Sequence, residues 1–291
     1  MISLSLSDRR PRIMGIVNVT PDSFSGDGVM AGLGKDFVDR AVDQGLRMIE
    51  DGAEILDIGG ESTRPGHTPI GADDELRRVI PVVEKLAATI GDACFISVDS
   101  SKASVAAAAL DAGALIVNDV TALQGDPAMA ALVARRGCPV VLMHNCSRAA
   151  AVTRDGKLGN AYQAPDMARW EDIFTTVVGD LQARLETALR AGITRERIIL
   201  DPGLGFGKTV AQNLELVRLT GKLREHFGLP LLVAPSRKSF IGQTLDLPPD
   251  DRLEGTAACV AIAAFLGADI LRVHDVKAMR RVARMAAAVR G

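Results

Sequence analysis

The stretch CFISVDSSKASVAAAALDAGALIVND (94–119) contains the structural unit on which this chain is built. It begins with an apolar run at 94–98, continues with an alanine-rich segment of high helix propensity at 102–113, and ends with a second apolar run at 114–117. Gly113 is a natural residue for the end of the helix, because glycine adopts a left-handed conformation without strain. Two parallel strands need a crossover between them, so the stretch predicts a parallel β-α-β unit.

The same alternation of apolar and helical segments extends along the whole chain. Eight short apolar runs are predicted strands: IMGIV (13–17), EILDI (54–58), CFISV (94–98), ALIV (114–117), PVVLM (139–143), RIIL (197–200), PLLVA (230–234) and DILRV (269–273). Helices are predicted at 35–52, at 72–90, at 102–113, from Asp126 onward, and at 166–191, 209–227, 251–267 and 275–290. Pro81 is expected to kink or shorten the second helix, and Asp126 is expected to cap the fourth. Eight strand-helix units predict an α/β fold, a (β/α)8 TIM barrel formed by a single domain over residues 1–291.

Polar side chains follow almost every predicted strand. They are Asn18, the GGESTRPG stretch at 59–66, Asp99, Asn118 with Asp119, His144, Asp201, the SRKS stretch at 236–239, and Arg272 with His274. In a parallel barrel all strand ends meet on one rim, where such enzymes have their active sites. The competing fold is an open sheet of the Rossmann type, which concentrates its chemistry at one switch point. The count of eight units and the even spread of polar strand ends favour the barrel.

The composition is that of an ordinary globular protein, with no charge that favours nucleic acid or an anionic membrane. Hydrophobic residues make up 47% of the chain, the net charge is −2 and the pI is about 6.1. Residues 1–12 are too short and too polar for a signal peptide, and no apolar stretch is long enough for a membrane span. The cysteines lack the paired spacing of a zinc site or a redox motif; they are Cys94, Cys138, Cys146 and Cys259. We therefore expect a cytoplasmic protein that acts on small molecules.

Three of the polar strand-end residues suit the edge of a nitrogen heterocycle. Asp99 and Asp201 each offer a carboxylate that accepts hydrogen bonds from a ring N–H and a neighbouring amino group, and Asn118 both donates and accepts. Asp201 opens the stretch DPGLGFGKT (201–209), which is not a phosphate loop, because Pro202 occupies the position of the first glycine. Each aspartate alone is more often a helix cap, but the three residues together indicate a binding site for a polar ring.

Positive charges follow other strands and predict an anion site in a chain that is otherwise slightly acidic. They are Arg64, Arg237, Lys238, Arg272 and His274. Asn18 offers a neutral oxygen of the kind that Mg²⁺ accepts when water and substrate phosphates supply its other ligands. Ser236 has no obvious partner base, so a covalent serine mechanism is not expected. The pattern indicates a diphosphate and a polar heterocycle as ligands, without a protein nucleophile.

The segment at 145–165 is long, polar and without periodicity. It follows the strand that ends at Met143 and His144, so on a barrel it emerges beside the predicted ring-binding residues. Two interpretations stay open, a cover over the substrate and an inert surface loop.

The motifs together resemble those of the dihydropteroate synthases, in order and spacing, over nearly the whole chain. They are MGIVNVTPDSFS, DIGGESTRPG, ISVDSSKASV, VNDV, VVLMH, DPGLGFGKT, SRKSFIG and RVHDV. The resemblance implies a (β/α)8 barrel, usually a homodimer, that joins p-aminobenzoate to (7,8-dihydropterin-6-yl)methyl diphosphate in folate biosynthesis and releases pyrophosphate. It also implies Mg²⁺ as the cofactor and sulfonamide analogues of p-aminobenzoate as inhibitors.

Carried over residue by residue, the resemblance assigns three groups of contacts. The pterin is held by Asp99, Asn118, Asp201 and Lys238, with Met143 packed on it. The diphosphate is held by Arg64, Arg272, His274 and Asn18, with Mg²⁺ at Asn18. The p-aminobenzoate pocket is framed by Thr63, Pro65 and Ser236, with Phe24 and Phe206 as apolar walls. The residues with catalytic roles are Lys238, Asp99, Asp201 and Arg272.

The chain departs from the family pattern at three places. The usual SFSDGG reads SFSGDG, which displaces Asp27 by one position, Ser100 replaces the customary threonine, and MHNCSR (143–148) replaces an MHMRG-like stretch. Two alternatives are a pterin-binding methyltransferase domain and a non-catalytic pterin-binding relative. The first has no diphosphate to bind, which SRKS and RVHD argue against. The second would be expected to lack Lys238, Arg272 or Asn18, and all three are present.

Overall fold

Residues 10–20, 35–63, 66–147, 152–162 and 172–291 are described by a computed structural model. Phe24, Arg64 and Pro65, three of the residues predicted to contact substrate, lie outside the described residues, and so does Asp27.

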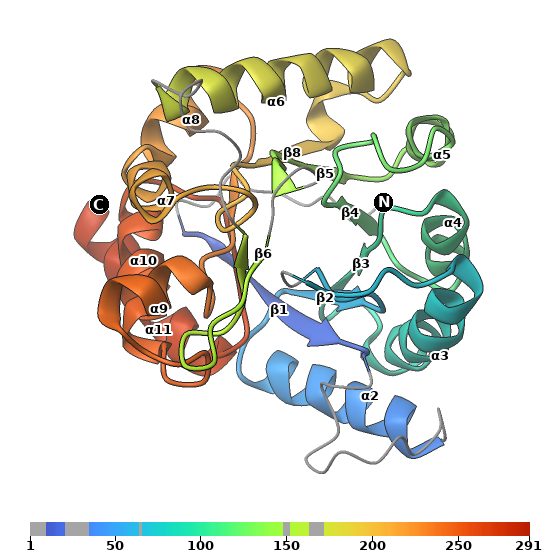
Figure 1. The fold of residues 1–291 in the computed structure, drawn as a ribbon. Coiled ribbons are helices and arrows are strands. Elements are labelled where there is room, and N and C mark those ends of the chain that lie inside the picture. The colour runs from blue at the N-terminus through green and yellow to red at the C-terminus, as the bar shows by residue number, and fades with distance from the viewer. Residues whose placement is uncertain (1–9, 21–34, 64–65, 148–151, 163–171) are drawn as a thin grey trace.

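Eight parallel strands form the barrel, and each coincides with one of the predicted apolar runs (Figure 1). They are β1 (Arg12–Asn18), β2 (Ile55–Gly59), β3 (Phe95–Asp99), β4 (Ile116–Asp119), β5 (Val140–Met143), β8 (Ile198–Asp201), β9 (Leu232–Val233) and β10 (Ile270–Val273). Their order is β8-β5-β4-β3-β2-β1-β10-β9, and a parallel bridge from Leu200 to Leu231 joins the two ends. The TIM barrel is confirmed and the open-sheet alternative is wrong, because the first and last strands of the series meet.

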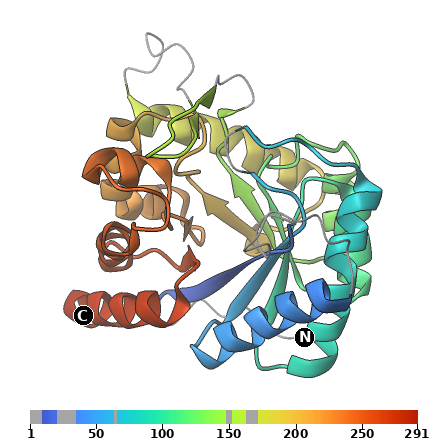
Figure 2. The same ribbon diagram turned by 60° about the horizontal axis from the view of Figure 1, so that its bottom comes forward.

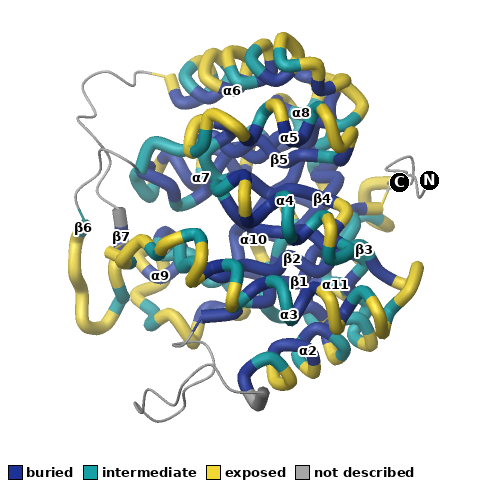
Figure 3. Tube along the Cα trace, turned by 90° about the vertical axis from the view of Figure 1, so that its right-hand side faces the viewer, coloured by how far each residue is buried: buried dark blue, intermediate teal, exposed yellow. Residues whose placement is uncertain are grey.

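Helices surround the strands, and α2 and α11 both pack against β1 (Figure 2). The helices are α2 (Lys35–Glu50), α3 (Ala72–Ile90), α4 (Ala103–Asp111), α5 (Met129–Arg136), α6 (Ile173–Arg190), α7 (Val210–Arg218), α8 (Thr220–Phe227), α9 (Ser239–Leu245), α10 (Leu253–Phe265) and α11 (Val276–Arg290). The barrel strands are buried along most of their length, whereas the exposed residues lie on the helices and loops around them (Figure 3). Among the described residues, no helix has the length and apolar character needed to cross a membrane.

Two expectations about the helices were wrong, and the shortening expected from Pro81 is not found, whereas the kink expected from it stays a prediction. The segment 209–227 forms two helices that meet at Leu219, and Gly221 brings α8 so close to Leu266 that a Cβ there would lie 2.9 Å from the Leu266 oxygen. Pro81 does not shorten α3, because buried side chains on both sides of it hold the helix on the core. Asp126 does not cap α5, which begins at Met129; its carboxylate accepts hydrogen bonds from the backbone of Ala103 and Ala128 instead.

The barrel interior has two layers of side chains. The lower layer is an apolar cluster of Met14, Ile55, Ile116, Val141, Ile199, Leu232 and Ile270, with Phe95 packed against it. Strand side chains alternate between faces, so residues two positions further along point into the same interior. These residues, called here the upper layer, are Ile16, Asp57, Ser97, Asn118, Met143, Asp201, Ala234 and Arg272. The interior therefore changes from apolar to mostly polar towards the carboxyl ends of the strands.

The 145–165 segment is not wholly irregular, because it contains a small antiparallel hairpin of β6 (Val152–Thr153) and β7 (Ala161–Tyr162). The hairpin lies beside α9 (Figure 3), and Lys157 forms an ion pair with Asp246 at the end of that helix.

Candidate active site at the carboxyl ends of the strands

A cavity of about 650 Å³ opens above the upper layer. This volume is in the usual range for a site that binds a small molecule. Its lining includes nine of the residues predicted from the sequence: Asn18, Thr63, Asp99, Phe206, Ser236, Arg237, Lys238, Arg272 and His274. They come from six separate strand ends or the loops after them, as expected for a barrel.

The other three described candidates, Asn118, Met143 and Asp201, are buried members of the upper layer and do not line this cavity. Asn118 Nδ2 donates to Asp57 Oδ2 at 2.9 Å, and Met143 lies opposite Asp201 in the register of β5 and β8. These three residues therefore lie below the cavity, in contact with or next to other residues of the upper layer.

Arg272 connects two aspartates and forms what we call the arginine cluster. Its Nε donates to Asp57 Oδ2 at 2.6 Å, and its Nη2 donates to Asp99 Oδ2 at 2.7 Å. Burial raises the pKa of Asp99 to about 7; Arg272 opposes this rise, and Asp57 adds to it. Asp57 is completely buried, and its Oδ1 atom has no hydrogen-bond partner among the described residues. A buried acceptor of this kind is costly unless a ligand or water supplies a donor.

Asp57 was missed in the sequence because it lies inside the apolar run EILDI rather than after it. The alternation of the strand could have revealed it. Residues two positions apart point to the same face of a strand, so Asp57 points into the barrel if Ile55 does.

Lys238 and Asp201 form a second charged region, called here the lysine pair. The Lys238 ammonium donates to the Leu204 carbonyl oxygen and lies 4.7 Å from the centroid of the Phe206 ring. Burial lowers the pKa of Lys238 to about 7, and the nearby Asp201 carboxylate opposes this fall. Burial also raises the pKa of Asp201, whose Oδ1 accepts from the Gly203 backbone N–H at 2.7 Å.

The glycine-rich loop after β8 packs closely on the segment after β5. Gly203 has a φ of +68°, and a Cβ there would lie 1.8 Å from the His144 carbonyl oxygen, so only glycine fits. Lys208 is buried and donates to the carbonyl oxygens of His144, Gly203 and Phe206. Its charge therefore holds the loop together, which agrees with the prediction that this loop is not a phosphate loop.

Ser236 and His274 contact each other, contrary to the expectation that Ser236 lacks a partner base. The Ser236 hydroxyl oxygen lies 2.9 Å from His274 Nδ1 and also accepts from the His274 backbone N–H at 3.1 Å. Both contacts join the same two residues, so they fix the orientation of the His274 ring at the cavity.

Arg237 was predicted as a cation for an anionic ligand, but its guanidinium forms two hydrogen bonds with Asp275, at 3.0 and 2.6 Å. It has a φ of +56°, a strained conformation for a residue with a side chain, and it turns the chain immediately before Lys238. The buried Arg252 stabilises this turn, because its Nη1 donates to the Arg237 carbonyl oxygen at 2.9 Å.

The hairpin lies at the edge of the cavity. Leu158, Gly159 and Asn160 line it, and the Leu158 carbonyl oxygen accepts from Arg252 Nη2 at 2.6 Å. One arginine thus connects the hairpin to the turn before Lys238. This position favours the interpretation of the segment as a cover.

The fold and the cavity define a barrel enzyme that binds a small polar ligand at the carboxyl ends of its strands. The model of the pterin-binding enzyme family matches residues 14–274. The dihydropteroate synthase of Bacillus subtilis (strain 168) is 44% identical over 273 residues, which cover 94% of this chain and 86% of that protein.

Two solved structures from Xanthomonas albilineans have a TM-score of 0.82 to this chain. One is a dihydropteroate synthase with 4-aminobenzoic acid, 43% identical, covering 97% of this chain and 94% of that one. The other is in complex with 7,8-dihydropteroate, 40% identical, covering 99% and 96%. The chain therefore belongs to the dihydropteroate synthase family, within the pterin-binding enzymes.

Proposed function

We propose that this protein condenses p-aminobenzoate with (7,8-dihydropterin-6-yl)methyl diphosphate to give 7,8-dihydropteroate and pyrophosphate, a transfer of a pterinylmethyl group in folate biosynthesis. The observation that carries the proposal is one cavity that combines carboxylates for a ring, cations for an anion and an apolar wall at Phe206. The folate-synthesis relatives support the same reaction.

The polar residues of the upper layer and Asp99, which lies above that layer, bind the pterin ring in this proposal. Asp57, Asp99 and Asp201 accept hydrogen bonds from ring N–H and amino groups, and the unpartnered Asp57 Oδ1 is a natural acceptor for one of them. Asn118 orients Asp57, and Lys238 donates to an acceptor atom of the ring. Met143 supplies an apolar contact from the same layer.

The diphosphate is bound at the other side of the cavity. Arg272 uses Nε and Nη2 for the two aspartates, which leaves Nη1 for a diphosphate oxygen. His274 presents its oriented ring, and Arg64 adds a charge in the proposal. Thr63, Pro65 and Ser236, with Phe24 and Phe206, frame p-aminobenzoate.

Mg²⁺ fits the oxygen donors of this cavity. Asn18, Ser62 and Thr63 offer neutral side-chain oxygens at its wall, whereas Glu61 pairs with Lys102 and Asp99 with Arg272. Such a set suits an ion that keeps several waters and takes most of its other ligands from substrate phosphates. Asn18 would hold it, and bound Mg²⁺ would neutralise charge on the departing diphosphate.

The chemistry needs no protein nucleophile. The bond between the pterin methylene and the diphosphate oxygen breaks, and its electron pair leaves with the diphosphate. The remaining positive charge spreads over the pterin, where the carboxylates of the upper layer stabilise it. The aniline nitrogen then forms the new C–N bond and gives up one proton. The protein chiefly orients the two substrates and stabilises charge.

Pyrophosphate release tests this function. With both substrates and Mg²⁺ we expect continuous release, and with either substrate omitted we expect none. Release from the pterin diphosphate alone, at the same rate, would indicate a hydrolase and contradict the proposal. Sulfonamides are expected to compete with p-aminobenzoate in the same assay.

We also propose a homodimer of single-domain chains in the cytoplasm. Apolar side chains on the outer faces of α10 and α11 support it: Ile262, Phe265, Met285 and Val289 are 44–64% exposed. The four free cysteines suit a reducing compartment.

Light scattering on the purified protein checks the dimer. The wild type is expected to have twice the mass of the chain, and Phe265→Asp combined with Met285→Asp is expected to give monomers. Leu189→Asp, on α6, is the control and should remain dimeric. A monomeric wild type would disprove the dimer.

A further inference from the structure

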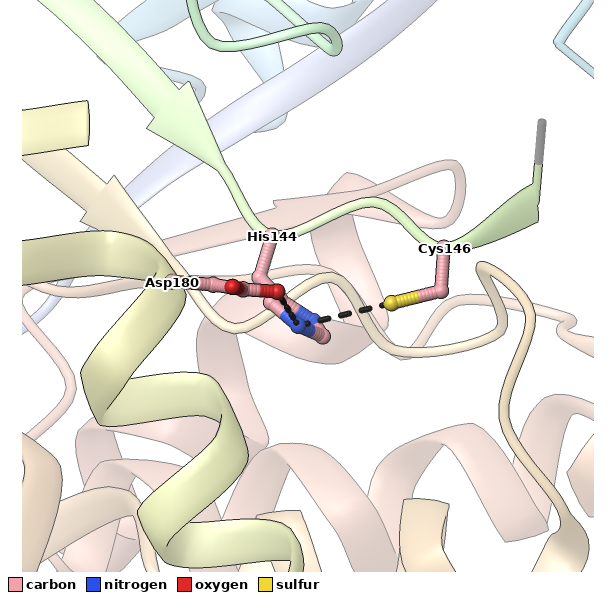
Figure 4. A group of neighbouring side chains, drawn as sticks. All are labelled: His144, Cys146 and Asp180. Carbon is pink, nitrogen blue, oxygen red and sulfur yellow. Dashed lines mark hydrogen bonds and ion pairs between the residues drawn. The ribbon is translucent and has the colours of Figure 1, made fainter. Parts of the chain in front are cut away.

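Three side chains of types that bind metals, His144, Cys146 and Asp180, lie together outside the lining of the substrate cavity. His144 and Cys146 follow β5, Asp180 lies on α6, and all three side chains point toward one another (Figure 4). His144 Nε2 lies 3.2 Å from Asp180 Oδ2 and 3.4 Å from Cys146 Sγ. The three donor atoms all lie within 4.8 Å of one another.

The two separations that involve His144 match those in a tetrahedral zinc site. Zinc binds imidazole nitrogen and carboxylate oxygen at about 2.0 Å and thiolate sulfur at about 2.3 Å. At a tetrahedral angle these bond lengths place nitrogen and oxygen about 3.3 Å apart, and nitrogen and sulfur about 3.5 Å apart. The two distances in the protein differ from these by about 0.1 Å. The third separation, between the Asp180 oxygen and the Cys146 sulfur, is at most 4.8 Å, against about 3.5 Å in a tetrahedral site, so binding requires these two side chains to close on the ion.

We propose that His144, Cys146 and Asp180 bind one Zn²⁺ ion, with water in the fourth position, at a site separate from the substrate cavity. The donor set determines the choice of metal. A thiolate and an imidazole favour Zn²⁺ over the hard ions Mg²⁺ and Ca²⁺, which prefer oxygen ligands. None of the three residues lines the substrate cavity.

The charges around the site are compatible with zinc. Burial lowers the pKa of His144 to about 4, so its ring is neutral; the proton that Nε2 donates to Asp180 has to move to Nδ1 before Nε2 binds the ion. The hydrogen bond with His144 lowers the pKa of Asp180, which is therefore ionised. Burial raises the pKa of Cys146, so this thiol has to release its proton to the solvent when the ion binds. One thiolate and one carboxylate then balance Zn²⁺, which matters because Lys208 and Arg184 already bring positive charge close to His144.

An ion can reach this site from solvent, and its binding would connect three segments of the barrel. The Asp180 side chain is 55% exposed, so solvent reaches one side of the cluster. The Cys146 backbone N–H donates to the Phe206 carbonyl oxygen at 3.4 Å, which connects the cluster to the loop that carries an apolar wall of the cavity. A bound ion would therefore tie α6, the segment after β5 and the loop after β8 together. Cys146 belongs to the MHNCSR stretch, where the chain departs from the family pattern, so we infer the site for this chain and not for the family.

Cobalt substitution tests the proposal in the full-length protein without any activity assay. Metal-free protein titrated with Co²⁺ is expected to bind one ion per chain, with a thiolate-to-cobalt charge-transfer band and the intense visible bands of a tetrahedral ion. Cys146→Ser should lose the charge-transfer band, and Asp180→Asn should weaken binding at least about tenfold. Cys259→Ser, which changes a cysteine outside the cluster, should bind like the wild type.

Zinc content and thermal unfolding give a second readout. Zn²⁺ should raise the unfolding temperature of the wild type in proportion to the logarithm of its concentration, and should raise that of Cys146→Ser much less. An octahedral cobalt spectrum without charge transfer in the wild type would overturn the proposal. Equal binding by wild type and Cys146→Ser would overturn it as well. Because the readouts are metal binding and stability, their failure would leave the proposed synthase activity untouched.

Discussion

The arginine cluster and the lysine pair lie in the same part of the barrel but hold their charges in opposite ways. In the arginine cluster, Arg272 is fixed by two charge-assisted hydrogen bonds to Asp57 and Asp99. In the lysine pair, Lys238 has a carbonyl oxygen and the face of a phenyl ring as its contacts, and burial lowers its pKa to about 7. The position and charge of Arg272 are therefore fixed by the protein itself. The protonation state of Lys238, by contrast, can change when a ligand binds.

This difference separates stability from activity. Removing a partner from a network of buried charges leaves another charge uncompensated, which costs folding free energy. In the proposed function the strongest partner of the desolvated Lys238 is the ligand, so its removal should cost mainly binding and catalysis. Four predictions test the separation.

The largest effect is expected for Asp57→Ala. It leaves Arg272 Nε and Asn118 Nδ2 without their shared acceptor, so the free energy of unfolding should fall by about 3–5 kcal/mol. Urea denaturation measures it, with Asp111→Ala, an exposed surface aspartate, as the control. A loss below about 1 kcal/mol would mean that the cluster is not a stabilising network.

Lys238→Ala should lower activity and leave stability nearly unchanged, the opposite of Asp57→Ala. We expect kcat/KM to fall by an amount equivalent to roughly 2–4 kcal/mol of transition-state stabilisation, while the fold remains intact. Steady-state kinetics and thermal unfolding are measured together, with the exposed Lys277→Ala as the control. Near-wild-type kinetics in a well-folded variant would remove Lys238 from the site.

The lowered pKa of Lys238 predicts a pH dependence with a definite sign. Between pH 7 and the ordinary lysine pKa of 10.5, the unfolded chain binds more protons than the folded one at this residue, so the contribution of Lys238 to stability rises with pH in that window. Binding of an anionic substrate should raise the lysine pKa again and take up about one proton at pH 8 to 9.

Calorimetric titration with the pterin diphosphate and Mg²⁺, without p-aminobenzoate and in buffers of different ionisation enthalpy, measures this uptake. The quantity to compare is the difference between wild type and Lys238→Ala, since the ligand's own ionisation then cancels. Equal proton uptake by both proteins would show that Lys238 does not titrate on binding.

The smallest effect is expected for the hairpin. Replacing residues 150–160 with a short glycine linker removes Leu158, Gly159 and Asn160 from the cavity edge. KM for the pterin diphosphate should rise several-fold and its salt dependence should weaken, because Arg154 and Lys157 are lost as well. Unchanged kinetics together with an unchanged unfolding temperature would make the segment an inert surface loop.

The sequence predicted the barrel well because each strand is a continuous apolar run between amphipathic helices. The sequence also located the strand-end residues, because a residue that directly follows a barrel strand lies on the rim where the strands end. It could not show which charges pair with one another. Arg237 looked like a ligand cation and is bound to Asp275, 38 residues away.

Other features were missed for different reasons. Asp57 was hidden inside an apolar run, and the break at Leu219 leaves no proline or unusual spacing in the helical pattern of 209–227. The contact between Ser236 and His274 depends on the neighbouring positions of β9 and β10 in the barrel, which only the closed fold reveals.

The most direct test of the central claim is to quantify both products in one reaction mixture. With p-aminobenzoate, the pterin diphosphate and Mg²⁺, the wild type is expected to form 7,8-dihydropteroate and pyrophosphate in equal amounts, and Lys238→Ala to form almost none of either. Pyrophosphate in large excess over dihydropteroate, or equal product formation by the two proteins, would contradict the account of a synthase that acts through this cavity.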